Sequence, residues 1–268
     1  MHRYVKPLAA LLCAAAFAPL AHGFGVGLQP ATVEMTIKEG DRQRQVITIG
    51  NVHKEKTISL QLSLADWTLD ADGQLALSPP GESERSGADW VRFSPAQVTL
   101  KPETSQDVTV EITTPHKIKS RGDHRFALLA TTLLPEDRGG ASGVWSKYQL
   151  ASLFYLTLRP SKSLAVVENV RVTEDDGASV VIELANEGDA HARVQGVAMI
   201  KDASGKLWNE AEINTVVIEG VDRDIKVALG QPPSGTYTVD LDLENIYVPQ
   251  NDFRPVDLKA DSIEYVAP

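Results

Sequence analysis

The sequence predicts an all-β protein made of two tandem immunoglobulin-like β-sandwich domains. Short runs in which polar and apolar residues alternate recur from Val26 onward, and clusters of Gly, Pro, Asn or Asp separate most of them. Hardly any stretch shows the period of an amphipathic helix. Many short strands at this spacing are typical of an antiparallel sandwich.

The N-terminus resembles a secretory signal peptide, which we place at residues 1–23. Arg3 and Lys6 supply a positive n-region, residues 8–18 form an apolar h-region, and residues 21–23 suit cleavage. The apolar run is too short to span a bilayer comfortably. We therefore expect an exported, soluble product that is cleaved near residue 23.

Composition narrows the function further. Cys13, inside the predicted signal peptide, is the only cysteine, so core packing rather than disulfides must hold the exported chain together. The chain carries 36 acidic and 26 basic residues, a net charge of −10. This acidic balance argues against nucleic acid and anionic membrane surfaces as partners.

The first domain is predicted to span residues 24–160. A first strand is expected within residues 25–37, where a turn at residues 38–41 ends it. Further strands are expected at residues 45–51, 57–67, 74–79, 91–95, 97–100, 107–114, 125–135 and 149–160.

The second domain is predicted to span residues 161–268. Pro160 ends the preceding strand and a short polar linker follows it. New alternating runs occupy residues 166–173, 179–186, 193–200, 215–220, 225–229 and 236–243.

The segment at residues 149–160 is apolar on both faces. Leu150, Phe154 and Leu156 share one parity, and Leu153 and Tyr155 share the other. Strands of antiparallel sheets usually alternate, because one face meets water. This segment therefore lies inside a core or binds a partner.

Motifs for chemistry are missing from the sequence. It has no GxSxG, P-loop or cysteine nucleophile. His53, His116, His124 and His191 lack ligand spacing, which favours solvated or singly bonded histidines over a metal site. The acidic ladder at residues 240–244 is read as a water-facing strand surface rather than a calcium site. We expect no catalytic residue, metal or cofactor, and hence no enzyme.

The order of features in the first half resembles the PapD-like periplasmic chaperones that assemble bacterial pili. These features are GVGLQPATVEM, VITIGN, SLQLSLADW, FSPAQVTLKPETSQDVTVEI, RGDHRFALLATTLLPE and the closing QLASLFYLTLRP. The match covers about residues 26–160. It implies a periplasmic chaperone that binds pilus subunits and assists their assembly.

The resemblance also implies a binding mode. The last strand of the first domain would add to an incomplete pilin-like subunit, with the backbone bonding and alternate side chains fitting a groove. By this resemblance the contacts are Val144, Ser146, Tyr148 and Leu150. The expected partner is a secreted pilin-like subunit, and an outer-membrane usher is a further candidate.

The anchoring residues of that family are not matched. The family holds the subunit's terminal carboxylate with an Arg and a Lys, but here residues 25–40 contain no Arg and residues 149–158 no Lys. A buried carboxylate needs donors, so Arg121, Arg125 and Arg159 are the candidate replacements.

Two other functions stay open. The same two sandwiches could be a structural or adhesive subunit of a surface assembly. A carbohydrate-binding module using Trp90 or Trp145 is a third reading, because tryptophan rings can stack on sugars.

Overall fold

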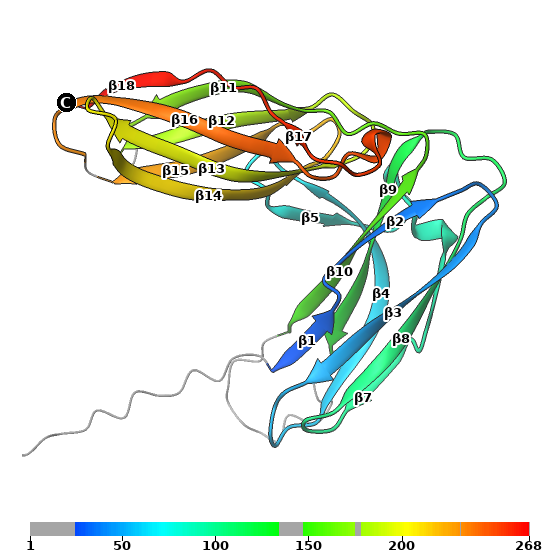
Figure 1. Cartoon of the computed structure of the whole chain (residues 1–268). Coiled ribbons are helices and arrows are strands. Elements are labelled where there is room, and N and C mark those ends of the chain that lie inside the picture. Colours follow the sequence, from blue (N-terminus) through cyan, green and yellow to red (C-terminus); the bar gives the residue numbers. More distant parts are fainter. Residues whose placement is uncertain (1–24, 134–146, 175–177, 231, 268) are drawn as a thin grey trace, which may run out of the picture.

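The computed structural model describes residues 25–133, 147–174, 178–230 and 232–267, which leaves the predicted signal peptide outside. Over these ranges the chain folds into two β-sandwiches that meet at an elbow (Figure 1). Helix is confined there to two 3-10 turns, η1 (Ala88–Trp90) and η2 (Pro249–Asn251). The predicted fold class, two tandem immunoglobulin-like sandwiches, is confirmed.

The first sandwich contains two sheets. One sheet has the order β1 (Val26–Gln29), β3 (Arg42–Asn51), β8 (Ser105–Thr113), β6 (Val91–Ser94). The other has the order β2 (Thr32–Ile37), β10 (Gln149–Leu158), β9 (Gly122–Thr132), β4 (Ile58–Leu69), β5 (Leu75–Ser78), and β7 (Gln97–Leu100) also pairs with β4. The chain changes sheets between β1 and β2 at Pro30, which has no N–H to offer a ladder.

The second sandwich also contains two sheets. The smaller has the order β11 (Ala165–Thr173), β12 (Ala178–Asn186), β15 (Arg223–Gly230). The larger has the order β14 (Leu207–Val217), β13 (Ala192–Asp202), β16 (Gly235–Asn245), β17 (Val256–Asp257), and β18 (Ile263–Ala267) also pairs with β16.

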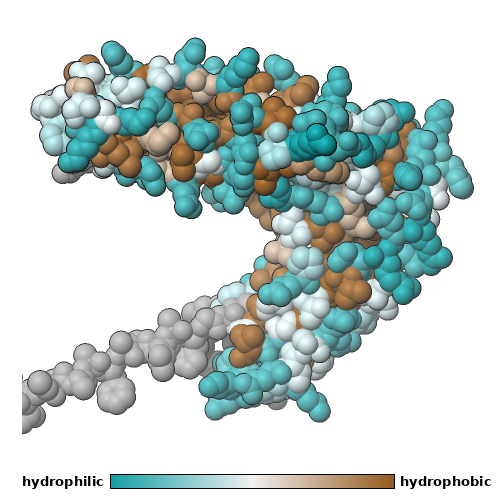
Figure 2. Space-filling view, viewed as in Figure 1, coloured by the Kyte–Doolittle hydropathy of each residue, from teal (hydrophilic) through white to brown (hydrophobic). Residues whose placement is uncertain are grey.

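Each sandwich buries its own apolar core. In the first, alternate residues of β3, β4, β8, β9 and β10 point inward, and the rings of Phe126 and Phe154 stack with centroids 4.3 Å apart. In the second, Ile182, Val194 and Ile200 are among the buried residues of β12 and β13. Hydrophobic residues also reach the surface among hydrophilic ones along the first sandwich (Figure 2).

Strand β10 is buried on both faces because it belongs to two cores. Phe154 and Leu156 point into the core of the first sandwich. Leu153 and Tyr155, on the opposite face, join a third apolar cluster that includes Ile218 of the second domain. The two-faced apolar pattern in the sequence is thus explained mainly by the packing of one domain against the other.

The third cluster is the apolar part of the domain interface. Its buried members are Ala65, Trp67, Ala127, Leu129, Tyr155 and Ile218. The indole N–H of Trp67 donates to the carbonyl of Phe126 at 3.0 Å, and its ring meets Tyr155 edge-on at 4.9 Å. The tryptophan therefore buries its ring with its polar atom satisfied.

Replacing Leu156 by Ala should lower the free energy of unfolding by about 2–5 kcal/mol. Its side chain is fully buried in the first core, so truncation leaves a cavity. Leu77→Ala is the control: Leu77 is 40% exposed, and its truncation should change the free energy by less than about 0.5 kcal/mol. Urea unfolding measures the free energy of unfolding of both variants. Equal decreases in that free energy would contradict this description of β10.

Candidate functional site

The start of β10 is an open strand edge at the end of the first sandwich that lies away from the elbow. β10 pairs with β9 along its whole length, whereas its parallel pairing with β2 begins only at Leu153. Among the residues that the structure describes, residues 149–152 therefore pair with a strand on one side alone. Figure 1 shows this part of β10 beside β1.

Two residues turn backbone groups toward this open edge. Thr132 N–H donates to Tyr148 O, so the even-numbered residues of this register bond to β9. The odd-numbered residues face the other way, as Leu153 shows by donating its N–H to Ala31 O at 2.9 Å. The N–H and C=O groups of Gln149 and Ala151 therefore point to the side on which no described strand pairs with them. An extended peptide could bond to them.

The predicted contact residues divide into two pairs. Val144 and Ser146 lie outside the described residues. Tyr148 is 44% exposed, and Leu150 is partly buried against the core of the first sandwich. The edge described here, residues 149–152, thus overlaps the predicted segment only at its C-terminal end. From Leu153 onward β2 covers the strand.

Arg125, one of the three predicted anchors, is already bonded to a carboxylate of this chain. Both carboxylate oxygens of Glu219, from the second domain, lie 2.6 Å from Nη1 of Arg125. Both side chains are nearly buried, and the guanidinium lies over the ring of Trp67 at 5.5 Å. Arg125 therefore supports the domain interface in this structure.

Arg121 and Arg159, the other two predicted anchors, lie together near the linker. Arg121 donates to the carbonyl of Arg159 at 3.2 Å, and Arg159 donates to the carbonyl of Pro249 at 2.8 Å. A cavity of about 640 Å³ adjoins Arg159. Its lining residues are Arg159, Pro160, Ser161, Lys162, Glu187, Gly188, Asp189 and Gln250. Arg159 follows the last residue of β10, roughly 30 Å along the strand from Leu150.

A buried polar network joins the two domains at the elbow. His191, just before β13, places Nδ1 2.6 Å from Oδ2 of Asp123 on β9 and Nε2 3.2 Å from Oε1 of Glu34 on β2. The backbone N–H of His191 donates to the same oxygen of Asp123 at 2.7 Å. Neither Asp123 nor His191 exposes its side chain to solvent. Arg193 completes the network by donating to Glu34.

The second carboxylate oxygen of Asp123 is also satisfied. Thr157 of β10 donates to it at 2.6 Å, and the Thr157 hydroxyl lies 2.7 Å from the hydroxyl of Tyr247. Because Thr157 has a single proton, Tyr247 must be the donor in the second bond. The rings of Tyr247 and Tyr155 lie 3.9 and 4.2 Å from that of His191.

The network moves the pKa of each of its central groups toward the charged form. Burial would raise the pKa of Asp123, but the hydrogen bond and charge of His191 outweigh it and the pKa is lowered. The pKa of Glu34 is lowered likewise, with burial opposed by His191 and Arg193. For His191, burial would lower the pKa, but Asp123 and Glu34 raise it.

Glycine permits the close approach of the two domains at this point. Gly122, at the start of β9, has φ of +85°, and a Cβ there would lie 1.9 Å from the carbonyl oxygen of Asp189. That approach allows the Asp123 N–H to donate to Asp189 O at 2.8 Å. Any side chain at residue 122 would separate the two elements.

The expectation of solvated or singly bonded histidines is wrong for His191, which bridges two carboxylates. The ring of His124 is buried as well. Its Nε2 lies 3.1 Å from the carbonyl of Ser120, and burial lowers its pKa. The groups around His191 come from distant segments and meet only where the two domains pack together, so a search for ligand spacing in the sequence could not find them. The available signal for a buried polar site was the pair of charged residues Asp123 and Arg125 in the otherwise largely apolar segment that forms β9.

This network does not have the arrangement of a hydrolytic site. Both ring nitrogens of His191 face carboxylates, and the nearby hydroxyl of Thr157 bonds to Asp123 rather than to the ring. Nucleophilic catalysis needs a hydroxyl bonded to the base. Within the described ranges no group of three His, Cys, Asp or Glu side chains could hold a metal ion.

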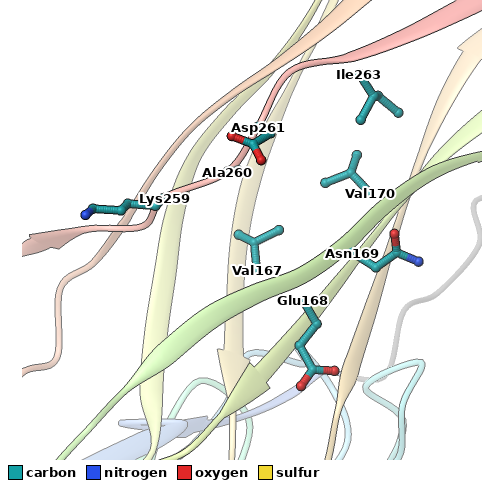
Figure 3. Close-up of a pocket in the computed structure, with 8 residues that line it drawn as sticks. All are labelled: Val167, Glu168, Asn169, Val170, Lys259, Ala260, Asp261 and Ile263. Carbon is teal, nitrogen blue, oxygen red and sulfur yellow. The ribbon is translucent and has the colours of Figure 1, made fainter.

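Other features have structural roles. Trp90, a predicted sugar platform, is half-buried against the first core with its ring 4.6 Å from that of His124, while Trp145 lies outside the described residues. A hollow of about 310 Å³ lies beside β11 (Figure 3). Val167, Val170 and Ile263 belong to the second core, and Lys259 and Glu168 point away from the hollow. We assign it no site.

The fold is similar to that of solved fimbrial chaperones, the family that the sequence resembles. The YadV chaperone is 11% identical, with a TM-score of 0.48, and the match covers 90% of this chain and 100% of that one. The class 5 fimbriae chaperone CfaA is 11% identical, with a TM-score of 0.43 and coverages of 91% and 99%.

A third similar structure is a chain of the CsuC–CsuE chaperone–tip adhesion subunit pre-assembly complex from Acinetobacter baumannii. It is 12% identical, with a TM-score of 0.46, and the match covers 87% of this chain and 97% of that one. No family model and no curated protein matches the sequence. These similarities concern overall architecture alone, and nothing about the site is taken from them. In the described part of the chain no helix is long and apolar enough to cross a membrane.

Glu219→Gln should destabilise the protein by about 3–5 kcal/mol, because it leaves the buried charge of Arg125 without its partner. The matched control is Glu111→Gln, which removes the partner of the exposed Arg42 and should have little effect. Thermal or urea unfolding at neutral pH measures both. If the two variants lose similar amounts of unfolding free energy, the Arg125–Glu219 pair adds nothing specific to the interface.

Proposed function

We propose that this protein is a periplasmic, non-catalytic chaperone that binds a secreted protein subunit by β-strand addition at the start of β10. The open backbone edge at Gln149 and Ala151 carries this proposal. Export through the predicted signal peptide places the protein where such subunits are assembled. A pilin-like subunit is the client class that the sequence resemblance favours, and an usher is a further partner.

The edge has the physical properties that strand addition needs. Two residues with outward backbone groups provide up to four hydrogen bonds to an added strand, and β9 holds them in the extended conformation beforehand. Tyr148 and Leu150 place an exposed ring and a partly buried side chain next to these groups. A client strand would cover apolar surface that otherwise presents an aggregation hazard.

The far end of β10 supplies the proposed contact for a client carboxylate. Arg121 and Arg159 are the cations we propose for it, because both lie at the surface near the linker cavity. Arg125 is not retained in this role, since Glu219 of this chain already pairs with its charge. Because β2 covers β10 between the two places, the edge and the cations would contact separate segments of the client.

Ala151→Pro tests the edge directly. Proline removes the N–H that points to the open side and leaves the bonds to β9 in place, so the free protein should keep its fold. Binding of the client should fall at least tenfold, because the added strand loses a hydrogen bond and meets the proline ring. The client that co-purifies with tagged wild-type protein is identified by mass spectrometry, and its affinity for purified variants is then measured.

Ser152→Pro is the matched control. Its N–H faces β9, so proline there should damage the fold itself. If Ala151→Pro retains both its fold and full client affinity, the edge is not the binding site and the proposed function is wrong.

Tyr148→Asp tests the apolar contact. A charge placed in an apolar groove of the client costs several kcal/mol or forces protonation, so co-purification should be lost. The free protein should melt close to the wild-type temperature, because the side chain is 44% exposed. Leu156→Asp, in the core, should unfold the first domain. A Tyr148→Asp protein that melts as early as Leu156→Asp would identify residue 148 as core.

A further inference from the structure

His191 is enclosed by charged and aromatic groups of both domains. It belongs to the second domain, yet its two ring nitrogens face Asp123 and Glu34 of the first. The rings of Tyr247 and Tyr155 lie against it, and its side chain has no exposure to solvent. The titration of one side chain is therefore coupled to the contact between two domains.

The distances define the protonation state that fits this site. A carboxylate oxygen can only accept, so the Nδ1 that lies 2.6 Å from Asp123 must carry a proton. The Nε2 that lies 3.2 Å from Glu34 attracts that carboxylate only if it is protonated too. The imidazolium form satisfies both contacts, whereas a neutral ring would turn a lone pair toward Glu34.

The charges around His191 balance only in that form. Asp123 and Glu34 supply two negative charges, and Arg193 with protonated His191 supplies two positive ones. Loss of the His191 proton leaves an uncompensated negative charge at a buried site, which is costly. Several titratable or charged side chains face the His191 ring or lie next to a side chain that faces it. They are Glu34 of β2, Asp123 and Arg125 of β9, Tyr155 of β10, Arg159 of the linker, Arg193 of β13, and Tyr247.

We propose that the elbow is a pH-sensitive joint in which protonated His191 holds the two domains at one angle and deprotonated His191 allows that angle to vary. The covalent connection between the sandwiches is a single short linker after β10. The third apolar cluster and the Arg125–Glu219 pair do not include His191, so they keep the domains in contact when its proton is lost. What changes is the restraint that the polar network places on their orientation.

The sign of the pH dependence follows from the directions of the shifts. The pKa of His191 is raised above its usual value of 6.5. The stability that its charged form contributes to the domain contact is therefore complete below pH 6.5 and is lost as the pH rises through the folded-state pKa. The pKa values of Asp123 and Glu34 are lowered, so their contribution is lost only as the pH falls below the usual carboxyl range. The joint is therefore held at pH values below the folded-state pKa of His191, which lies above 6.5, and loosens as the pH rises through it.

The first measurement is an NMR titration of the imidazole resonances in the full-length exported chain. His191 should titrate above 6.5, and Glu34→Gln should move its midpoint down, because one of the two acceptors that favour the imidazolium is neutralised. Glu34 is partly exposed, so this variant should fold even if His191→Gln does not. A midpoint at or below 6.5 would overturn the proposal.

The second measurement is the distance between the domains by single-molecule fluorescence transfer. Gln106→Cys on β8 and Asn214→Cys on β14 are exposed labelling positions, and Cys13 of the predicted signal peptide is the only native cysteine. The distance distribution should be narrow below the His191 midpoint and broaden above it. In Glu34→Gln the broadening should begin at a lower pH by the shift seen in the titration.

His116→Gln is the control, because His116 is exposed and takes part in none of the hydrogen bonds described for the network. It should leave the pH at which the distribution broadens unchanged. A distribution that stays equally narrow across the His191 titration would show that the joint does not respond to this proton. Neither measurement involves a client, so the proposal can fail without affecting the proposed function.

Discussion

The requirement that β10 bury two apolar faces determines much of this molecule. A strand in the outer layer of a two-sheet sandwich has only one face covered by its own domain. Leu153 and Tyr155 on the other face would meet water if the second domain did not cover them. Burying large apolar side chains of this kind contributes about 1.5–3 kcal/mol each. The second domain is therefore part of the structural support of the strand that we propose binds the client.

The same face also carries charges, which an apolar contact normally excludes. Asp123 and Arg125 lie on the same face of β9 as Ala127 and are buried where the second domain covers them. Each is compensated from across the interface, Asp123 by His191 and Arg125 by Glu219. Buried charges tolerate few alternative partners, because an unpaired one is costly. Apolar burial holds the domains together, and the charges select one orientation.

Alternation and turn residues were enough to predict the fold, because strands of two-sheet sandwiches have a polar and an apolar face. The edge was predicted only through a resemblance. Its extent depends on where β2 begins to pair, at Leu153, which no local pattern encodes. The elbow network could not be predicted either, because Glu34, Asp123 and His191 come from three distant segments. Single-sequence patterns report period and local turns, whereas such contacts depend on how two finished domains meet.

The shared apolar cluster has a consequence for folding. Trp67 and Leu129 come from the first domain and Ile218 from the second, so neither domain can complete this cluster alone. A first domain expressed without the second would expose a contiguous apolar surface on β4, β9 and β10, and surfaces of that kind lead to self-association. During synthesis the N-terminal half emerges first, and its part of the shared cluster stays uncovered until Ile218 has been made. The second domain therefore covers an apolar surface of the first, although each domain has a core of its own.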